Sequence, residues 1–179
     1  MNLEKYKDLS LQELDKLKDN FDVIVKWVAW IVKTTDWDLL LVLENENKAW
    51  KKKWQWSIPM ETIEEGETSW QALLRWLKEE LNLGLSSKMK VWPEDLLIPF
   101  VVFDSKKHKL ILVELEIYSV LLESDKIRNL LNFSSWEINK IKSVSLRDYL
   151  SMKNLRPGNK EIFEGINKST VIIDWEYLN

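Results

Sequence analysis

The pattern of apolar and polar positions predicts a series of strands joined by polar turns. From Ile111 to Ile117 the odd-numbered residues are Ile, Val, Leu and Ile, which is the two-residue period of a strand. The polar turn Asp104–His108 joins this segment to the apolar run Ile98–Phe103, so a hairpin is expected here. Further strands or extended stretches are predicted at 21–33, 39–44, 56–59, 138–145 and 171–177.

Helical periodicity is clearest in Thr68–Leu83, where apolar residues recur every three or four positions. The stripe consists of Trp70, Leu73, Leu74, Leu77 and Leu81. Thr68 and Gln71 have the spacing of a capping box, and Asn82 or Gly84 can end the helix in the left-handed conformation. Shorter helices are predicted at 11–18, 124–131, 146–152 and 157–166. This mixture of strands and isolated helices indicates a layered α/β domain.

Composition narrows the range of functions. The chain has 179 residues, a formal net charge of -3, no cysteine and one histidine. Disulfides, thiolate metal sites and a cysteine nucleophile are therefore excluded. A nucleic-acid polymer is not expected as a partner, because binding to a phosphate backbone usually needs a basic surface. The first residues lack the apolar core of a signal peptide, and charges interrupt the long apolar runs, so we expect no membrane partner and a cytoplasmic location.

The numbers of tryptophan and glycine are unusual. The chain has 11 Trp and 4 Gly, whereas average usage would give roughly a dozen Gly. Several Trp also occupy turn-like contexts, for example Trp37, Trp54 and Trp136. One hypothesis is that some Trp positions, including Trp76, are UGA codons that the source organism reads as Gly. The alternatives are a genuinely Trp-rich protein and an organism that reads UGA as Trp. UGG codons at all four of these positions would exclude the first hypothesis.

Two adjacent acids stand in the last turn of the predicted helix 68–83. Glu79 and Glu80 lie where the helix dipole is negative, which disfavours carboxylates by about 0.3–1 kcal/mol each. A bound divalent cation would reverse that penalty, because hard ions such as magnesium prefer carboxylate oxygens. Arg75 lies four residues before Glu79 and can pair with it. The alternative is an ordinary solvated, acidic helix end.

The segment before and within this helix resembles the Nudix box. From Glu61 to Leu83 the chain reads E-T-I-E-E-G-E-T-S-W-Q-A-L-L-R-W-L-K-E-E-L-N-L. The family pattern is Gly, five residues, Glu, seven residues, then Arg-Glu-apolar-x-Glu-Glu-x-Gly-apolar. Six positions match it at the proper spacing: Glu67, Arg75, Leu77, Glu79, Glu80 and Leu83. The upstream Trp-x-x-Pro at 56–59 is also typical of the family.

Three positions depart from the pattern. Glu61 and Asn82 stand where the pattern has Gly, and Asn tolerates the left-handed conformation that Gly would take. Trp76 stands where the pattern has Glu, and in the family that Glu often ligates metal or acts as the general base. Neither Trp nor a recoded Gly can replace a carboxylate, so this departure bears on activity.

The resemblance implies a Nudix-type α/β/α sandwich with a mixed β-sheet. The order of predicted strands is compatible with this fold over residues 21–150. Residues 1–20 would then be an N-terminal helical extension, and residues 151–179 a C-terminal extension packed on the domain.

The resemblance also implies a hydrolase that cleaves a diphosphate bond in a nucleoside diphosphate linked to another moiety. Magnesium, or alternatively manganese, would sit on Glu80 and Glu79, supported by Glu67 and the backbone carbonyl of Met60. The ion would neutralise diphosphate charge and lower the pKa of a bound water, and a carboxylate would take the proton of that water. Arg75 would orient the glutamates through charge-assisted hydrogen bonds.

The general base and the substrate contacts are less defined. Family members often draw a further carboxylate from a later loop, for which Glu137 is the candidate, with Glu123 and Asp125 as alternatives. The basic cluster of Lys48, Lys51, Lys52 and Lys53 could meet substrate phosphates, with Lys52 and Lys53 preferred, or could be solvated surface. His108 is expected to be an exposed spectator.

Two further hypotheses stay open. Trp76 favours a catalytically silent Nudix-fold domain that binds a nucleotide or a protein partner. The other is an unrelated α/β domain with a fortuitous acidic helix. The identity of the diphosphate substrate and the oligomeric state do not follow from the sequence.

Overall fold

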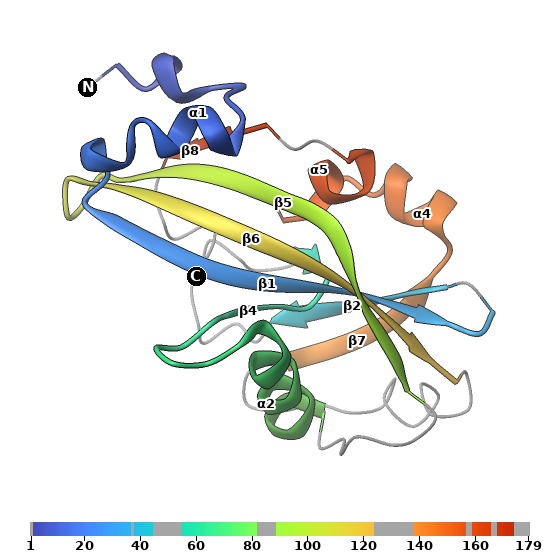
Figure 1. Cartoon of the computed structure of the whole chain (residues 1–179). Helices are drawn as coiled ribbons and strands as arrows, with labels where there is room; N and C mark the ends of the chain where they lie inside the picture. The colour runs from blue at the N-terminus through green and yellow to red at the C-terminus, as the bar shows by residue number, and fades with distance from the viewer. Residues whose placement is uncertain are drawn as a thin grey trace.

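A strongly twisted sheet with helices on both faces forms the body of the molecule (Figure 1). The computed structural model describes residues 2–36, 38–44, 55–81, 89–123, 138–156, 159–165 and 168–173. The strands are β1 (Val23–Thr34), β2 (Leu39–Glu44), β3 (Trp56–Ser57), β4 (Met60–Thr62), β5 (Lys90–Asp104), β6 (Lys109–Leu122), β7 (Ile138–Val144) and β8 (Thr170–Ile173). The helices are η1 (Glu4–Tyr6), α1 (Leu11–Asp15), η2 (Lys18–Asn20), α2 (Ser69–Leu81), α4 (Leu146–Ser151) and α5 (Asn159–Glu164).

The sheet is mixed, as predicted. Its strand order is β3-β2-β1-β6-β5-β8, with β4 also pairing with β1 and β7 with β2. β1 runs parallel to β6 along its whole length, whereas β5 and β6 form the predicted antiparallel hairpin. His108 lies in the turn of this hairpin with a φ of 52°, and its side chain is exposed.

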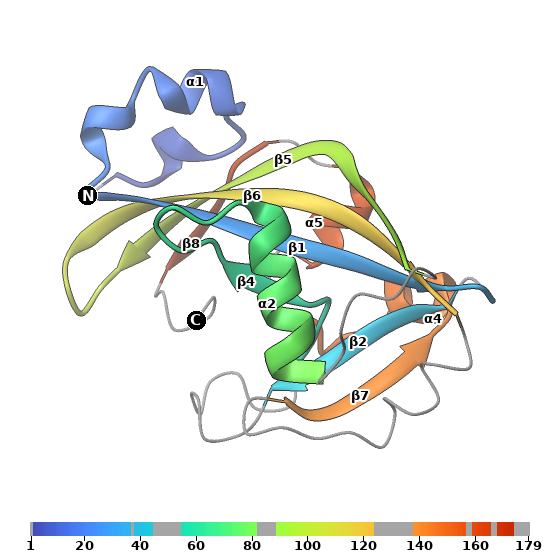
Figure 2. The ribbon, with the colours of Figure 1, turned by 60° about the horizontal axis from the view of Figure 1, so that its bottom comes forward.

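The two faces of the sheet bury different helices, because successive side chains of a strand point to opposite faces. In β1, Val28 and Trp30 pack with residues of α2, whereas Trp27 and Ala29 pack with residues of α4 and α5. Figure 2 shows α2 in front of the sheet and α4 and α5 behind it. The arrangement is therefore the α/β/α sandwich expected from the sequence.

The N-terminal segment closes one end of the sheet. The predicted helix at its start begins with a capping box, in which Ser10 and Glu13 exchange side-chain and backbone hydrogen bonds. Leu14 is fully buried and packs with Tyr6 against residues of β5 and β6. Full burial of a leucine side chain contributes about 1.5–3 kcal/mol. Ser169, which precedes β8, ties this segment down by accepting from the Leu9 N–H and donating to the Tyr6 carbonyl.

The structure differs from the sequence prediction mainly where strands are short or interrupted. β4 was not predicted, because three residues carry no periodic signal and only pairing with β1 makes them a strand. β5 begins at Lys90 rather than Ile98, and its register shifts between Pro93 and Leu97. A proline lacks the N–H of the ladder and is tolerated at such irregularities. The helix predicted at 124–131 lies outside the described residues.

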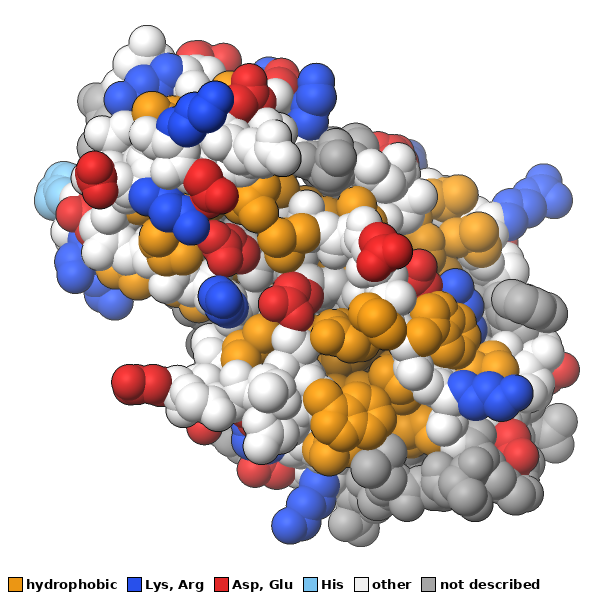
Figure 3. All heavy atoms as spheres, in the orientation of Figure 1, with side chains coloured by type: hydrophobic (Ala, Val, Ile, Leu, Met, Phe, Trp, Pro, Cys, Tyr) orange, Lys and Arg blue, Asp and Glu red, His pale blue; other side chains and the backbone are white. Residues whose placement is uncertain are grey.

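The surface mixes charges of both signs. On the face shown in Figure 3, lysine and arginine side chains lie among aspartate and glutamate, and hydrophobic side chains gather in the lower half of the view. None of the helices in the described ranges combines the length and the apolar character needed to cross a bilayer.

A buried amide joins the C-terminal segment to β3. Asn159, which is fully buried, accepts from the Ile58 N–H at 2.8 Å and donates to the Ser57 hydroxyl at 3.3 Å. The backbone adds two further bonds, from the Trp56 N–H to the Asn154 carbonyl at 2.8 Å and from the Arg156 N–H to the Trp56 carbonyl at 3.0 Å. Asn154, Arg156 and Asn159 therefore hold the chain immediately before β4.

Replacing this amide should weaken the fold. Asn159→Ala leaves the buried Ile58 N–H without its side-chain acceptor, so the free energy of unfolding should fall by about 1–3 kcal/mol. Urea denaturation measures the loss. Asn20→Ala, at an exposed position, is the matched control, and equal losses in the two variants would show that the buried bonds contribute nothing specific.

Candidate active site

The helix that carries the candidate chemistry begins at a well-formed cap. The Thr68 N–H donates to the Gln71 side chain at 2.8 Å, and the Gln71 N–H donates back to the Thr68 hydroxyl at 3.3 Å. This is the predicted capping box, and α2 follows from Ser69 to Leu81. The predicted termination at Asn82 or Gly84 lies outside the described residues.

The chain approaches α2 through a tight turn. The Glu67 N–H donates to the Glu64 carbonyl at 3.0 Å, and the Glu64 N–H donates to the Glu67 carboxylate at 3.0 Å. Gly66 has a φ of 78°, a conformation that glycine adopts without steric cost. The segment Glu64–Glu67 thus turns the Glu67 side chain back toward the helix.

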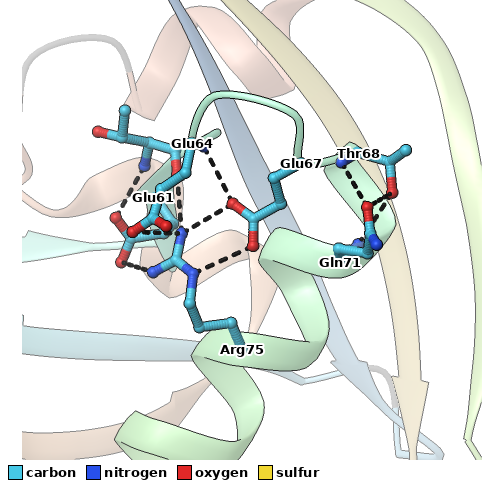
Figure 4. Close-up of polar contacts among 7 residues, drawn as sticks. Glu61, Glu64, Glu67, Thr68, Gln71 and Arg75 are labelled. Carbon is cyan, nitrogen blue, oxygen red and sulfur yellow. Dashed lines mark hydrogen bonds and ion pairs between the residues drawn. The ribbon is translucent and has the colours of Figure 1, made fainter.

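Arg75 receives this carboxylate in a two-pronged contact (Figure 4). Its Nε donates to one Glu67 oxygen at 3.1 Å, and its second guanidinium nitrogen donates to the other at 3.0 Å. The hydrogen bonds from Arg75 hold the pKa of Glu67 below its ordinary value, and the same bonds raise the pKa of Arg75. Both groups therefore stay charged near neutral pH.

Other groups of the loop complete the surroundings of Arg75. The guanidinium also donates to the Thr62 carbonyl at 3.0 Å and lies 3.9 Å from carboxylate oxygens of Glu61 and Glu64. Glu61, Glu64 and Glu67 thus converge on one cation, as Figure 4 shows. The sequence had suggested a pair between Arg75 and Glu79, but the ion pairs described for Arg75 are with the loop 61–67 instead.

Glu79 and Glu80 lie in the last turn of α2 with different exposures. Glu79 is exposed, whereas Glu80 is 5 % exposed. Glu80 follows Trp76 by four residues, so both side chains lie on the buried side of the helix. A carboxylate is seldom buried unless it is paired or coordinated.

The carbonyl of Met60 is directed toward the same side as the Arg75 network. Antiparallel ladders alternate hydrogen-bonded and non-hydrogen-bonded pairs. Trp30 donates to the Pro59 carbonyl and Ile63 to the Lys26 carbonyl, so Met60 and Ala29 form a non-hydrogen-bonded pair. The Met60 carbonyl therefore points away from β1, as does the Thr62 carbonyl that accepts from Arg75.

Trp76 is a core residue. It is 4 % exposed, and its ring centroid lies 5.2 Å from that of Trp30 at an interplanar angle of 31°. The position faces the sheet, so the side chain packs α2 onto β1. This leaves Glu79 and Glu80 as the carboxylates of the helix itself.

Comparison with known families identifies the arrangement. A family model described as the NUDIX domain matches residues 25–166, more than half of the chain. The chain belongs to the Nudix family. The segment containing Glu67, Arg75, Glu79 and Glu80 is therefore its Nudix box, with Trp76 in place of the usual glutamate.

Solved structures share this Nudix fold at low sequence identity. The dihydroneopterin triphosphate pyrophosphohydrolase of E. coli aligns with a TM-score of 0.57 and 14 % identity, covering 79 % of this chain and 94 % of that one. The NUDIX domain of NrtR from Shewanella oneidensis, solved with ADP ribose, gives 0.56 and 18 %, covering 86 % and 95 %. The MutT protein of Methanosarcina mazei gives 0.54 and 18 %, covering 78 % and 89 %. No curated protein sequence matches this Nudix chain.

The described residues of the Nudix box offer the types of oxygen ligand that a hard cation prefers. Glu79 and Glu80 offer carboxylate oxygens and Met60 a carbonyl oxygen, the ligand types that magnesium prefers. Both oxygens of Glu67, in contrast, accept hydrogen bonds from Arg75. Within the described ranges, no three acidic or histidine side chains are grouped closely enough to hold a metal ion.

Several predicted site residues fall outside the described residues. They are the candidate base Glu137, its alternative Asp125, and the basic cluster Lys48, Lys51, Lys52 and Lys53. Glu123, the other alternative base, is described and half-buried directly after β6. Their roles in the Nudix site stay predictions.

Sequence reasoning missed the part that Glu61 plays. It treated Glu61 only as a departure from the glycine of the Nudix box, whereas the Glu61 carboxylate lies 3.9 Å from Arg75. The available signal was charge, because four glutamates, Glu61, Glu64, Glu65 and Glu67, precede the single arginine of the box. What the sequence lacked was the pairing of β4 with β1, which brings Glu61 to Arg75.

The pairing of Glu67 with Arg75 should make stability depend on pH. The pKa of Glu67 is lowered in the folded protein, so its ionised form stabilises the fold fully above the ordinary value of 4.5. This contribution is lost as the pH falls through the lowered pKa. The difference in unfolding free energy between wild type and Glu67→Gln should therefore be present at neutral pH and vanish in acid.

Urea denaturation at a series of pH values tests this. Glu65→Gln, on the same loop but outside the network, is the control and should change the free energy of unfolding by less than about 0.5 kcal/mol. A Glu67→Gln difference that stays constant down to strongly acid pH would contradict the assignment.

Removal of the Trp76 ring should destabilise the core. Trp76→Ala deletes a buried aromatic side chain that packs on Trp30, so a loss of about 3–5 kcal/mol is expected. Trp70→Ala is the matched control on the same helix, because Trp70 is 40 % exposed. Thermal and chemical denaturation should show a much smaller loss for the control, and equal losses would rule out a packing role for Trp76.

Proposed function

We propose that this protein is a metal-dependent Nudix hydrolase that cleaves a diphosphate bond in a nucleoside diphosphate linked to another moiety. The observation that carries the proposal is the two-pronged contact between Arg75 and Glu67, which joins the loop of the Nudix box to the helix that bears Glu79 and Glu80. The match of the NUDIX domain to residues 25–166 supports the same reaction class.

Each box residue has a distinct role in this proposal. Glu79, Glu80 and the Met60 carbonyl hold magnesium or manganese, and Glu67 supports the site through Arg75. Arg75 is a positioning residue, since its donors are directed at the loop. When bound, the divalent cation neutralises diphosphate charge and lowers the pKa of a coordinated water.

The chain itself supplies the proton acceptor for the attacking water. Glu137, from a later loop, is the proposed proton acceptor, with Glu123 and Asp125 as alternatives, and Glu79 adds an exposed carboxylate on the last turn of the helix. A positioned base of this kind contributes about a hundred- to ten-thousandfold to the rate. Lys52 and Lys53 are proposed to contact substrate phosphates.

Names of the structural neighbours indicate the range of substrates to be tried. They include a dihydroneopterin triphosphate pyrophosphohydrolase, a domain solved with ADP ribose and an Ap4A hydrolase from C. elegans. The compounds in these names are all small phosphate-containing molecules. This supports a small nucleotide or diphosphate as the substrate of the present protein. Because each identity is below 20 %, these neighbours support the fold rather than any one substrate.

A second function is favoured by Trp76. The buried ring occupies the position where the family pattern has a glutamate that ligates metal or serves as base. A domain with this change could bind a nucleotide or a protein partner without hydrolysing anything. Glu79 and Glu80, the other two acids of the motif helix, are both retained. An activity assay therefore has to distinguish the hydrolase from the silent binding domain.

Turnover of a nucleotide panel with and without magnesium or manganese tests the proposal. The wild type should release phosphate or nucleoside monophosphate only with metal, and Glu80→Gln or Glu79→Gln should lower kcat/KM by about a hundredfold or more. Glu65→Gln is the control, because the Nudix pattern allows any residue at this position, and it should leave kcat/KM unchanged. Metal-dependent turnover that survives Glu80→Gln would refute the site assignment, and nucleotide binding with no turnover would favour the silent domain.

A further inference from the structure

A lysine lies over a tryptophan ring on the sheet face opposite to α2. The Lys142 ammonium of β7 is 4.2 Å from the centroid of the Trp56 ring, and its other described contact is with the Met152 sulfur at 3.5 Å. All three side chains are half-buried. Neither the Nudix box nor the roles proposed above use this pair.

The charge of Lys142 has no counter-ion among the described residues. Its described neighbours are an aromatic face and a thioether, and burial lowers its pKa. A cation over tryptophan is attracted by the negative face of the ring, but a sulfur atom is only a weak acceptor. An ammonium has three donors, so most of the hydrogen-bonding capacity of Lys142 is left for a ligand. A desolvated cation of this kind favours an anion over water.

The pair lies on the sheet face against which the Met60 side chain packs. Lys142 pairs with Leu41 across the β2–β7 ladder, and Leu41 belongs to the core on the face covered by α4 and α5. Trp56 and Met60 pack against that same core, and they are four residues apart. Four residues of fully extended chain span at most about 13 Å, so Trp56 lies within that distance of Met60. That is the length scale on which a diphosphate and the group attached to it extend.

The backbone that carries the Trp56 ring is held by hydrogen bonds. The Trp56 N–H and carbonyl are both bonded to the C-terminal segment, at 2.8 Å and 3.0 Å, and Asn159 holds Ser57 and Ile58 next to it. The platform under Lys142 is therefore preorganised, which lowers the entropic cost of binding.

We propose that Lys142, seated on Trp56, binds an anionic group, phosphate or carboxylate, on the moiety attached to the substrate diphosphate. This inference rests on the proposed function, which supplies the position of the diphosphate. Binding of an anion at Lys142 itself needs neither metal nor turnover. It predicts that substrates with a further negative charge on that moiety are preferred over neutral counterparts.

The direct test observes Lys142 by NMR in the metal-free wild-type protein labelled at the lysine Cε, with inorganic phosphate and acetate as separate probes. Lys142→Arg assigns the resonance. Phosphate or acetate, compared with chloride at the same ionic strength, should shift the Lys142 signal and raise its titration midpoint, while exposed Lys140, two residues away, stays unchanged. The more effective probe identifies the preferred anion. No response at Lys142, or an equal response at Lys140, overturns the subsite.

The kinetic test uses the substrates found in the nucleotide panel. Lys142→Met keeps the stem on Trp56 but removes the charge, so KM for substrates with the additional anionic group should rise about tenfold or more, with kcat little changed. Lys142→Arg should restore most of the affinity, and Lys140→Met should have no effect. An unchanged KM in Lys142→Met overturns the subsite even if the protein is an active hydrolase. The NMR shift stands by itself if no substrate is turned over.

Discussion

The two-pronged contact between Arg75 and Glu67 is the interaction on which the candidate site depends. It joins the turn before α2 to the middle of the helix, and the Thr62 carbonyl extends the same contact to β4. Because a planar guanidinium meets a carboxylate in one plane, the contact fixes direction as well as distance. The glutamates of the last helical turn and the Met60 carbonyl are thereby held on elements that cannot move independently.

The buried side of α2 shows how the family pattern has been altered without loss of the fold. Trp76 fills the space between α2 and Trp30, so a position associated with chemistry now stabilises the core. Glu80 remains on the same side of the helix, one turn later, and is 5 % exposed. Core packing therefore occupies a position to which the family pattern assigns a carboxylate, and Glu79 and Glu80 are the acids that remain on the helix.

The C-terminal segment acts on the site from the other face of the sheet. Asn159 and the backbone of Asn154 and Arg156 hold residues 56–58, from which the chain runs directly into the carbonyl of Met60. The same bonds hold the backbone of Trp56, whose ring lies beneath Lys142. One set of buried hydrogen bonds thus positions both the candidate metal donor and the proposed anion subsite.

The sequence alone determined the long elements and the local devices. Periodicity located α2 and the β5–β6 hairpin, and the spacing of Glu67, Arg75, Glu79 and Glu80 identified the family. These features depend on residues that are close together in the sequence, so the sequence alone is enough to predict them. Tertiary structure alone decided that β4 is a strand, that Glu61 reaches Arg75 and that Lys142 sits on Trp56. Those contacts join segments that are far apart in the chain or too short to carry a period, so no local pattern records them.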